Sequence, residues 1–543
     1  MEKHMYTHKK YYFYIILLLL ACMMGACSPM GEPEPSTTPS TIGSGGGTAP
    51  LPTAPTTPTA PTSPTTPTTP TTPTTPTTPT TPVPPVLQPL DRNSLNKITL
   101  QGASIDEYFA ADMTAANLDG DVFSDVVVST KGGNIYIFYG KDLHGKQGQT
   151  ISVNTNTKVI KNTSVTYTAQ NTNVSILGSN VTTGRFTTSN TANDLREDLV
   201  IHNSAYQNYL GGVFIFTPDQ LNSIGSGGIE LSQARYQIKG EVSTVEGEYT
   251  PGFGAYVTFV DLNGDSKNEL AISAPAAKTS QGRAAGRVYF YELNDFNTVP
   301  TGAVSDAKFS GKFIEGKAAY EYLGYFLKNI GDVNGDKKED ISLSAKVMSA
   351  LGFKTDAMVG IKGSLDLLKS GPVDIQNSIF FSLDWMVVRG EILYSLSDVN
   401  GDGKTDITYD KSIYFGSASS MTSNVNITST LSDANYTAVA SADIDRDGFQ
   451  DVFIKALSSY VKPYPSLYIV WGKSSGFSNS ISLPPSSTEA KEISYPDQNT
   501  WCKKVMSRDI NGDGVKDFIF SAPYNSSLSS PASYGYIYIY FLQ

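Results

Sequence analysis

A nine-residue acidic pattern recurs seven times between residues 117 and 517 of this chain. Each copy places Asp, Asn or Glu at its first, third, fifth and ninth positions, except where Ala192 stands at a third position. Side chains that alternate along a tight loop can turn several oxygen atoms toward one point, and hard cations such as Ca²⁺ take oxygen ligands. Glycine at the fourth or sixth position permits the positive φ that such a turn needs. The pattern therefore predicts a series of calcium loops.

The predicted metal ligands are the oxygen-bearing side chains at these four positions. They are Asn117, Asp119, Asp121 and Asp125; Asp194 and Asp198; Asp261, Asn263, Asp265 and Glu269; Asp332, Asn334, Asp336 and Asp340; Asp398, Asn400, Asp402 and Asp406; Asp443, Asp445, Asp447 and Asp451; and Asp509, Asn511, Asp513 and Asp517. A backbone carbonyl near the seventh position would complete each shell. We expect about six Ca²⁺ ions in a structural role, since filled ligand shells leave no open position for catalysis.

Two alternatives to this reading stay open. A single Asp-Gly or Asn-Gly loop is more often an ordinary turn than a metal site, and only the repetition of seven copies favours the metal. In the second loop, residues 190–198, Ala192 lacks a ligand oxygen and Arg196 intrudes. Whether that loop binds calcium is left undecided by the sequence.

The elements that position these loops are short strands. Each loop follows a strand-like stretch such as Phe253–Val260 and precedes an apolar one such as Leu270–Pro275, and an aromatic, β-branched third stretch such as Val288–Tyr291 comes next. The loops begin 45 to 73 residues apart, which leaves room for three or four strands and few helices. This spacing predicts four-stranded blades arranged radially.

The sequence Gly252-Phe253-Gly254, followed by the loop at Asp261 and by Ala274-Pro275, resembles the FG-GAP (VCBS) repeat of integrin α-subunits and their bacterial relatives. The resemblance covers about residues 96–543. It implies an all-β fold, a seven-bladed β-propeller of four-stranded antiparallel blades, with the acidic loops on one face and ligand-binding loops on the other. The last blade lacks a fourth strand, and we expect Lys97–Leu100 to supply it and so close the ring.

The first 26 residues are predicted to be a secretory signal. Lys3, Lys9 and Lys10 precede an apolar run from Tyr11 to Ala26 that is shorter than a membrane-spanning helix. The run ends in Met24-Gly25-Ala26-Cys27, which resembles the lipobox of bacterial lipoproteins and implies acylation of Cys27. Cys22 is a rival site. With Ser28 after the cysteine, the resemblance implies the outer membrane, at its outer surface or its periplasmic face.

Residues 27–95 are predicted to be the lipid anchor and a disordered tether. Of the 31 prolines in the chain, 19 lie between Pro29 and Pro89, with Thr-Thr-Pro triplets from Thr65 to Pro82. Such a segment has too few apolar residues to form a core and favours an extended spacer. The rest, residues 96–543, forms the propeller.

The composition argues against two classes of function. A total of 40 Lys and Arg against 51 Asp and Glu gives a net charge of −11, the wrong sign for a nucleic-acid binder. Only His144 and His202 would remain after signal cleavage, and we expect no catalytic residues.

We expect instead a monomeric head that binds an unknown protein or glycan in adhesion or ligand capture. Speculative contact residues are Tyr206, Tyr209, Tyr524 and Tyr534, in connections on the face opposite the acidic loops. The alternatives are a polysaccharide- or lipid-processing enzyme on a propeller scaffold and a passive assembly module of the cell envelope.

Overall fold

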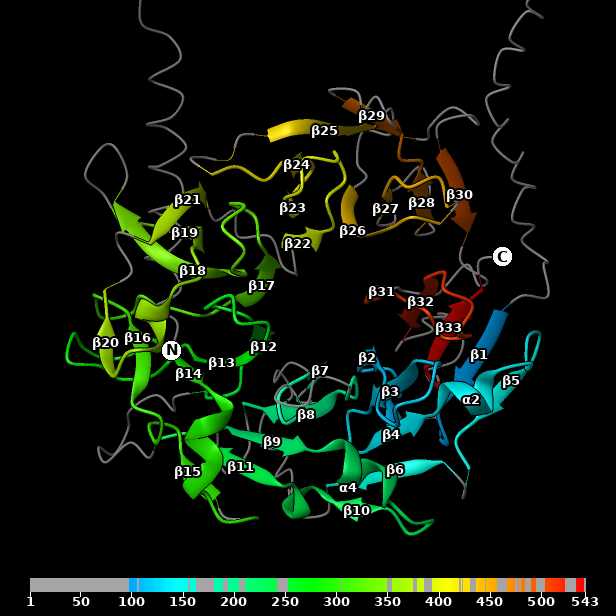
Figure 1. The fold of residues 1–543 in the computed structure, drawn as a ribbon, viewed down its shortest axis with the longest axis horizontal. Helices are drawn as coiled ribbons and strands as arrows, with labels where there is room; N and C mark the ends of the chain where they lie inside the picture. The colour runs from blue at the N-terminus through cyan, green and yellow to red at the C-terminus, as the bar shows by residue number, and fades with distance from the viewer. Residues whose placement is uncertain are drawn as a thin grey trace, which may run out of the picture. The chain divides into compact units, whose positions relative to one another are not determined.

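Each acidic loop joins two antiparallel strands of one sheet in the computed structural model, and seven such sheets follow one another along the chain (Figure 1). The chain divides into two units, Met1–Pro79 and Thr80–Gln543, and all described residues lie in the second. The structure describes residues 97–541 except 105–106, 155–156, 163–179, 189–193, 205–209, 242–251, 303, 349–353, 375–377, 385–392, 419–420, 422, 430–435, 445, 457–465, 474–476, 478–479, 484–489, 495–502 and 523–533.

The first strand of each sheet precedes an acidic loop, and the second strand follows it. The first strands are β2 (Asp112–Ala116), β7 (Asn180–Gly184), β12 (Val257–Val260), β17 (Leu327–Gly331), β22 (Leu393–Leu396), β26 (Tyr436–Ala442) and β31 (Val505–Arg508). The second strands are β3 (Asp125–Ser129), β8 (Asp198–Asn203), β13 (Glu269–Ala274), β18 (Asp340–Met348), β23 (Asp406–Tyr409), β27 (Asp451–Ala456) and β32 (Asp517–Ala522). Every second strand therefore begins at the ninth residue of its loop.

The third and fourth strands complete each antiparallel blade. The third strands are β4 (Ile135–Phe138), β9 (Gly212–Phe216), β14 (Arg287–Tyr291), β19 (Lys354–Ile361), β24 (Ser412–Tyr414), β28 (Ser466–Val470) and β33 (Tyr536–Tyr540). The fourth strands are β6 (Lys158–Lys161), β11 (Tyr236–Lys239), β16 (Lys312–Glu315), β21 (Ile379–Asp384), β25 (Ser423–Ser429), β30 (Ala490–Ser494) and β1 (Lys97–Gln101). The seven-bladed all-β propeller expected from the sequence is confirmed.

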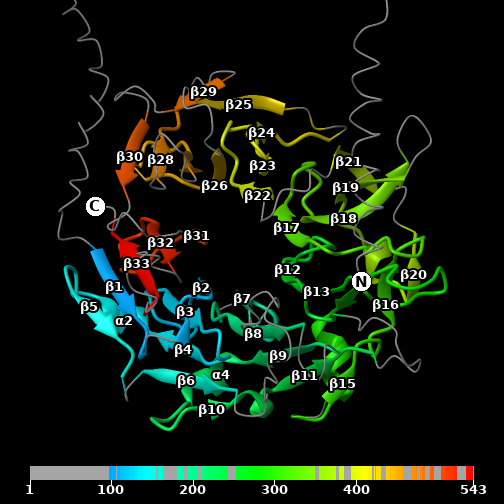
Figure 2. The same ribbon diagram turned by 180° about the vertical axis from the view of Figure 1, so that it is seen from behind.

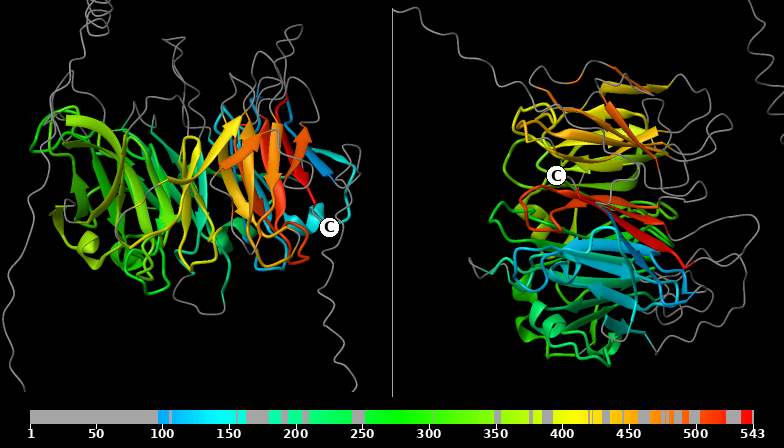
Figure 3. Two further views of the ribbon diagram at one scale, coloured as in Figure 1. Left: turned by 90° about the horizontal axis from the view of Figure 1, so that it is seen from above. Right: turned by 90° about the vertical axis from the view of Figure 1, so that its right-hand side faces the viewer.

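Two contacts close the ring. β1 pairs antiparallel with β33, from Lys97 opposite Tyr540 to Gln101 opposite Tyr536, so the first strand of the chain completes the last blade as predicted. Each first strand also lies beside the first strand of the next blade, and β31 lies beside β2. Figures 1 and 2 show the resulting ring from its two faces, and Figure 3 shows the strands running between those faces.

Five blades carry a fifth strand that the sequence analysis did not foresee. It comes from the connection between the third and fourth strands of the following blade, and it pairs parallel with the outer strand of the blade before it. These strands are β5 (Thr150–Ser152), β10 (Ile229–Glu230), β15 (Val304–Asp306), β20 (Gly371–Val373) and β29 (Ser480–Leu483). The predicted four-stranded antiparallel blades thus gain one parallel strand in these five sheets, because neighbouring blades also join at their outer edges.

The core is divided among the gaps between blades. Seven apolar clusters each combine side chains from two adjacent blades, for example Val200 and Ile215 with Leu270 and Tyr289. Second and third strands such as β8, β13 and β14 are covered on both faces by neighbouring blades, so they are buried at every residue rather than at alternate ones. β9, of sequence GVFIF, is buried at every residue.

The Phe-Gly signature ties the third blade to the second. Phe253 is fully buried and forms a bridge with Gly211, which immediately precedes β9. A Cβ at Gly211 would lie 1.9 Å from the carbonyl oxygen of Phe253, so only glycine fits there. Leu323 and Gly286 make the same bridge one blade later.

Helices among the described residues are short. They are α2 (Gly140–Leu143), α4 (Pro218–Asn222) and the 3₁₀ turns η2 (Leu231–Gln233), η3 (Leu293–Thr298) and η4 (Leu365–Leu368), each between a third and a fourth strand. α4 begins with a capping box in which Thr217 and Gln220 bond to each other's backbone amides. In this part of the chain no helix is both long and apolar enough to cross a membrane.

Candidate metal centres

The ninth-position acids form a buried layer beneath the loops. Asp125, Asp198, Asp340, Asp406, Asp451 and Asp517 are 0% exposed, and Glu269 is 3% exposed. In the fifth loop, Asp406 accepts hydrogen bonds from the backbone amides of Val399 and Gly416, both at 2.8 Å. Asp125, Asp340 and Asp451 make the same two bonds, to the second residue of the loop and to a glycine after the third strand. One carboxylate thus links three successive strands.

Burial disfavours the charge of these acids. It raises the pKa of Asp125, Asp340 and Asp406 to about 7 and that of Glu269 to about 8, against the opposing effect of the backbone N–H donors. A cation held in the loop would favour the charged form of each group. Every oxygen with one N–H donor still has a lone pair for such a cation.

The first, third and fifth positions turn their oxygens inward along the loop. In the fifth loop, Asp398 Oδ1 accepts from the amides of Gly401 at 2.6 Å and Asp402 at 3.0 Å, and its Oδ2 accepts from Gly403 at 2.6 Å. Asn400 Oδ1 accepts from Asp402, and Asp402 Oδ1 accepts from Lys404. The loops that begin at Asp261, Asp332 and Asp509 share the bonds of the first acid. The backbone is therefore wound around oxygen atoms.

This donor set is made of oxygen atoms, as calcium requires, but it carries few negative charges. Four of the loops have Asn at the third position, and the ninth carboxylate is engaged with the backbone. Among the described residues, no group of three or more His, Cys, Asp or Glu side chains converges in the way that metal ligands do. Asn190 and Asp445, which belong to the second and sixth loops, lie outside the described residues.

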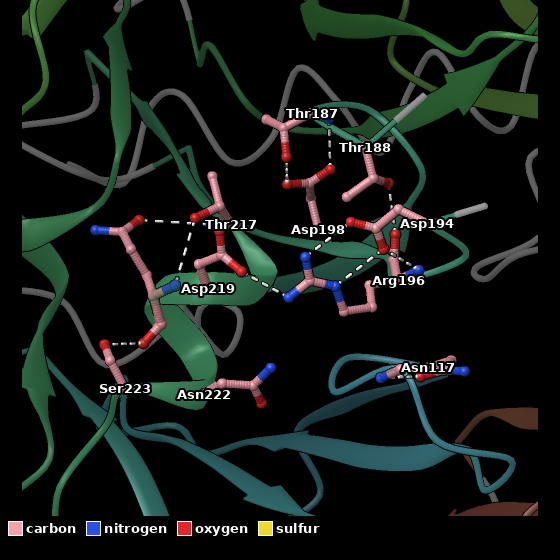
Figure 4. Close-up of polar contacts among 12 residues, drawn as sticks. Asn117, Thr187, Thr188, Asp194, Arg196, Asp198, Thr217, Asp219, Asn222 and Ser223 are labelled. Carbon is pink, nitrogen blue, oxygen red and sulfur yellow. Dashed lines mark hydrogen bonds and ion pairs between the residues drawn. The ribbon is translucent and has the colours of Figure 1, made fainter. Parts of the chain in front are cut away.

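The second loop is neutralised by an arginine. Arg196, at its seventh position, contacts Asp194 within the loop and Asp219 in α4 (Figure 4). The guanidinium lowers the pKa of Asp194, whereas burial, with a smaller contribution from the Asp119 carboxylate, raises the pKa of Asp121 at the same position of the first loop. The two fifth-position acids thus have opposite electrostatic environments.

Neighbouring loops are bonded to one another. The backbone amide of an eighth residue donates to the carbonyl of the first residue in the preceding loop, as from Glu197 to Asn117 at 2.7 Å and from Thr405 to Asp332 at 2.9 Å. The pairs Glu339 to Asp261 and Ser124 to Asp509 repeat this bond. In these four pairs one loop therefore supports its neighbour, and sequence periodicity alone carried no signal of this.

The inner strands enclose a polar cavity of about 510 Å³. Its wall includes Thr182, Thr258, Ser395, Ser441 and Ser507, which come from five different blades. Glu339 also reaches this wall, and its carboxylate accepts from the backbone amide of Asp261 at 2.8 Å. The cavity thus opens next to the ring of loops.

Of the four speculative contact tyrosines, the structure describes only Tyr534. Tyr206, Tyr209 and Tyr524 lie outside the described residues, and Tyr534 is half-buried. The structure instead exposes Tyr320 by 46% and Tyr325 by 58%, in the connection before β17. Because this connection enters a first strand at the end away from its acidic loop, both tyrosines lie on the opposite face. Sequence reasoning missed them by considering only the connections between second and third strands.

The match to a known family falls on the first three strands of one blade. The FG-GAP repeat family matches residues 253–291, from Phe253 through the loop at Asp261 to the end of β14. The chain carries an FG-GAP repeat. The resemblance drawn from the sequence is therefore confirmed, and the lipobox remains a prediction.

Two curated proteins share part of this sequence. Integrin alpha-4 of Xenopus laevis is 33% identical over 175 residues, which are 32% of this chain and 14% of that protein. Phosphatidylinositol-glycan-specific phospholipase D of Dictyostelium discoideum is 22% identical over 261 residues, 44% of this chain and 25% of that protein. The chain thus spans a quarter or less of the length of these relatives.

Solved structures also resemble this chain. A crystal structure of BBS1N in complex with ARL6DN, soaked with mercury, superposes with a TM-score of 0.42 at 9% identity and covers 81% of this chain and 94% of that one. The same complex soaked with lead gives a TM-score of 0.38 at 8% identity.

Proposed function

We propose that this propeller is a calcium-stabilised ligand-binding module held at the outer membrane by a lipid anchor on Cys27. The observation that carries the proposal is the set of acidic loops, whose side-chain oxygens turn inward at one face of a propeller with an FG-GAP repeat. The similarity to an integrin α-subunit supports the binding role. The Thr/Pro stretch would serve as a stalk between anchor and head.

Calcium is expected to act as a structural clip. It would bind oxygens of the first, third, fifth and ninth positions, and through the ninth acid it would brace the strands on either side of the loop. A ligand bound only to the folded state at 100 times its Kd adds about 2.7 kcal/mol per site. About six sites would therefore contribute a large part of the stability of the head.

The experiment is thermal unfolding of the purified head with 2 mM CaCl₂ or with EGTA, together with elemental analysis of the dialysed protein. We expect bound calcium and a melting temperature lower by more than 10 °C in EGTA. Re-addition of calcium after EGTA should restore the original value. A metal-free head that melts at the same temperature in both buffers would refute the calcium role.

The ligand is proposed to be a protein or a glycan that contacts the face opposite the loops. Exposed Tyr320 and Tyr325 offer flat rings for stacking and hydroxyl groups for hydrogen bonds. Glycan-array binding or capture of an envelope protein by the head, lost in Tyr320→Ala/Tyr325→Ala, would support this surface. If the double variant binds as well as the unmodified head, Tyr320 and Tyr325 are not part of the binding surface.

A second candidate is an enzyme acting on lipid anchors, which the similarity to a phosphatidylinositol-glycan-specific phospholipase D favours. Incubation of the head with a glycosylphosphatidylinositol-anchored reporter distinguishes the two. Release of the reporter would support the enzyme, and unchanged reporter beside measurable ligand binding would support the binding module. Protease shaving of intact cells decides on which side of the membrane the head lies.

A further inference from the structure

The second loop carries its own positive charge. Arg196 Nε lies 2.9 Å from Asp194 Oδ1, and Nη2 lies 2.7 Å from Oδ2, so both oxygens of the fifth-position carboxylate are bound by one guanidinium. The remaining nitrogen, Nη1, lies 2.6 Å from Asp219 Oδ1 in the first turn of α4 (Figure 4). Two-point arginine–carboxylate pairs are among the stronger side-chain hydrogen bonds.

The lysines at the same position of other loops do not do this. Lys404 reaches only one oxygen of Asp402, at 3.1 Å, and Lys338 lies 3.8 Å from Asp336. An ammonium group is a point charge on a flexible stem, whereas the guanidinium fork matches both oxygens of a carboxylate. Those lysines can swing away from an arriving ion without breaking a paired geometry.

Two more donors among the described residues of the second loop are also occupied. The carbonyl oxygen of Arg196, at the position where a calcium loop would offer its backbone ligand, accepts a hydrogen bond from Thr188 Oγ1 at 2.6 Å. Asp198 accepts from the amides of Phe186 and Thr187 and from the Thr187 hydroxyl. The third position is Ala192, whose side chain has no oxygen.

We propose that the second loop takes no calcium and that the Arg196 guanidinium serves as its permanent cation. A divalent ion would have to displace a three-point network and lie beside a fixed positive charge. The inference rests on the proposed calcium function of the other loops. The second blade would then stay folded without metal, so that one segment of the ring remains folded when calcium is removed.

Calcium counting and hydrogen exchange test this on the unmodified head. We expect no more than six ions per chain, and we expect EGTA to raise amide exchange in β23 and β32 at least tenfold while exchange in β8 rises less than twofold. Seven ions, or an equal rise in all three strands, would overturn the inference. A head that binds no calcium at all would refute the proposed function instead, and the variants below would still decide the role of Arg196.

Arg196→Gln and Lys404→Gln form a matched pair, since both sit at the seventh position of a loop. In EGTA we expect Arg196→Gln to raise exchange in β8 tenfold or more, and Lys404→Gln to change exchange in β23 less than twofold. In calcium, ion binding should be unchanged in Lys404→Gln. Equal effects of the two substitutions in EGTA would contradict a special role for the guanidinium.

Discussion

The second and fifth acidic loops occupy the same place in their blades and differ in what balances their acids. In the fifth loop, Lys404 contacts one oxygen of the fifth-position carboxylate, Asp402. In the second loop, Arg196 binds both oxygens of the fifth-position carboxylate, Asp194. Below both loops a buried ninth-position acid bonds to backbone amides. The contrast teaches that the buried acid is common to the fold, while the source of positive charge varies from blade to blade.

The largest effect is expected from removing that buried acid in each loop. Asp406→Ala leaves the amides of Val399 and Gly416 without their partner, and Asp198→Ala does the same to Phe186 and Thr187. Each buried, unpaired amide costs about 1–3 kcal/mol, so both variants should lose about 3 kcal/mol or more in EGTA. Chemical unfolding monitored by fluorescence measures the loss.

Calcium should then separate these two variants. In calcium, Asp406→Ala should lose additional stability because a metal ligand has gone, whereas Asp198→Ala should lose the same amount as in EGTA. An identical calcium response in both would mean that ninth-position acids only hold the backbone and do not bind the ion.

A second test measures how low pH changes the stability of the second blade through His202 in β8, the strand that follows the second loop. His202, near the far end of β8, is buried with Nδ1 2.7 Å from the carbonyl oxygen of Gly254, and burial lowers its pKa from 6.5 to about 4. The unfolded chain therefore binds a proton before the folded one, and stability falls as the pH drops from 6.5 toward 4. The loss from this group should reach about 2 kcal/mol at pH 5.

His202→Gln should flatten this part of the pH profile, and the control His144→Gln should leave it in place because His144 is exposed. Unfolding free energies at pH 7.5 and 5 measure the difference. If His202→Gln retains the full acid sensitivity, His202 does not cause it.

The smallest effect is expected at the first loop. Lys141 contacts Asp119 and lies 3.9 Å from Asp121, yet its side chain is 50% exposed. An exposed pair contributes about 0–1 kcal/mol, so Lys141→Gln should change stability in EGTA by less than about 1 kcal/mol. Calcium titration should show equal or slightly tighter binding, since a competing charge has gone. A large loss of stability would mean that Lys141, like Arg196, serves as a permanent cation of its loop.

Several features of the fold could be predicted because they depend on residues close together in the chain. The apolar runs, the Asp-Gly turns and their spacing marked the first three strands of most blades. The missing fourth strand of the last blade indicated that Lys97–Leu100 could close the ring, and β1 does so. The fifth strands were not predictable in this way. A segment such as Thr150–Ser152 is short and half polar, and it becomes a strand only because the outer edge of β1 lies beside it.

By itself, the sequence determined where the acidic loops lie and which residues carry their oxygens, since a tight turn is formed by neighbours in the chain. The tertiary structure alone decided what those oxygens contact. Asp219 is 23 residues from Arg196, Gly416 is ten from Asp406, and Thr405 bonds to the loop of another blade. The first two pairs meet only when the strands of one blade come together, and the third meets only when neighbouring blades pack, because burial of the apolar faces fixes the distances at which the polar groups pair.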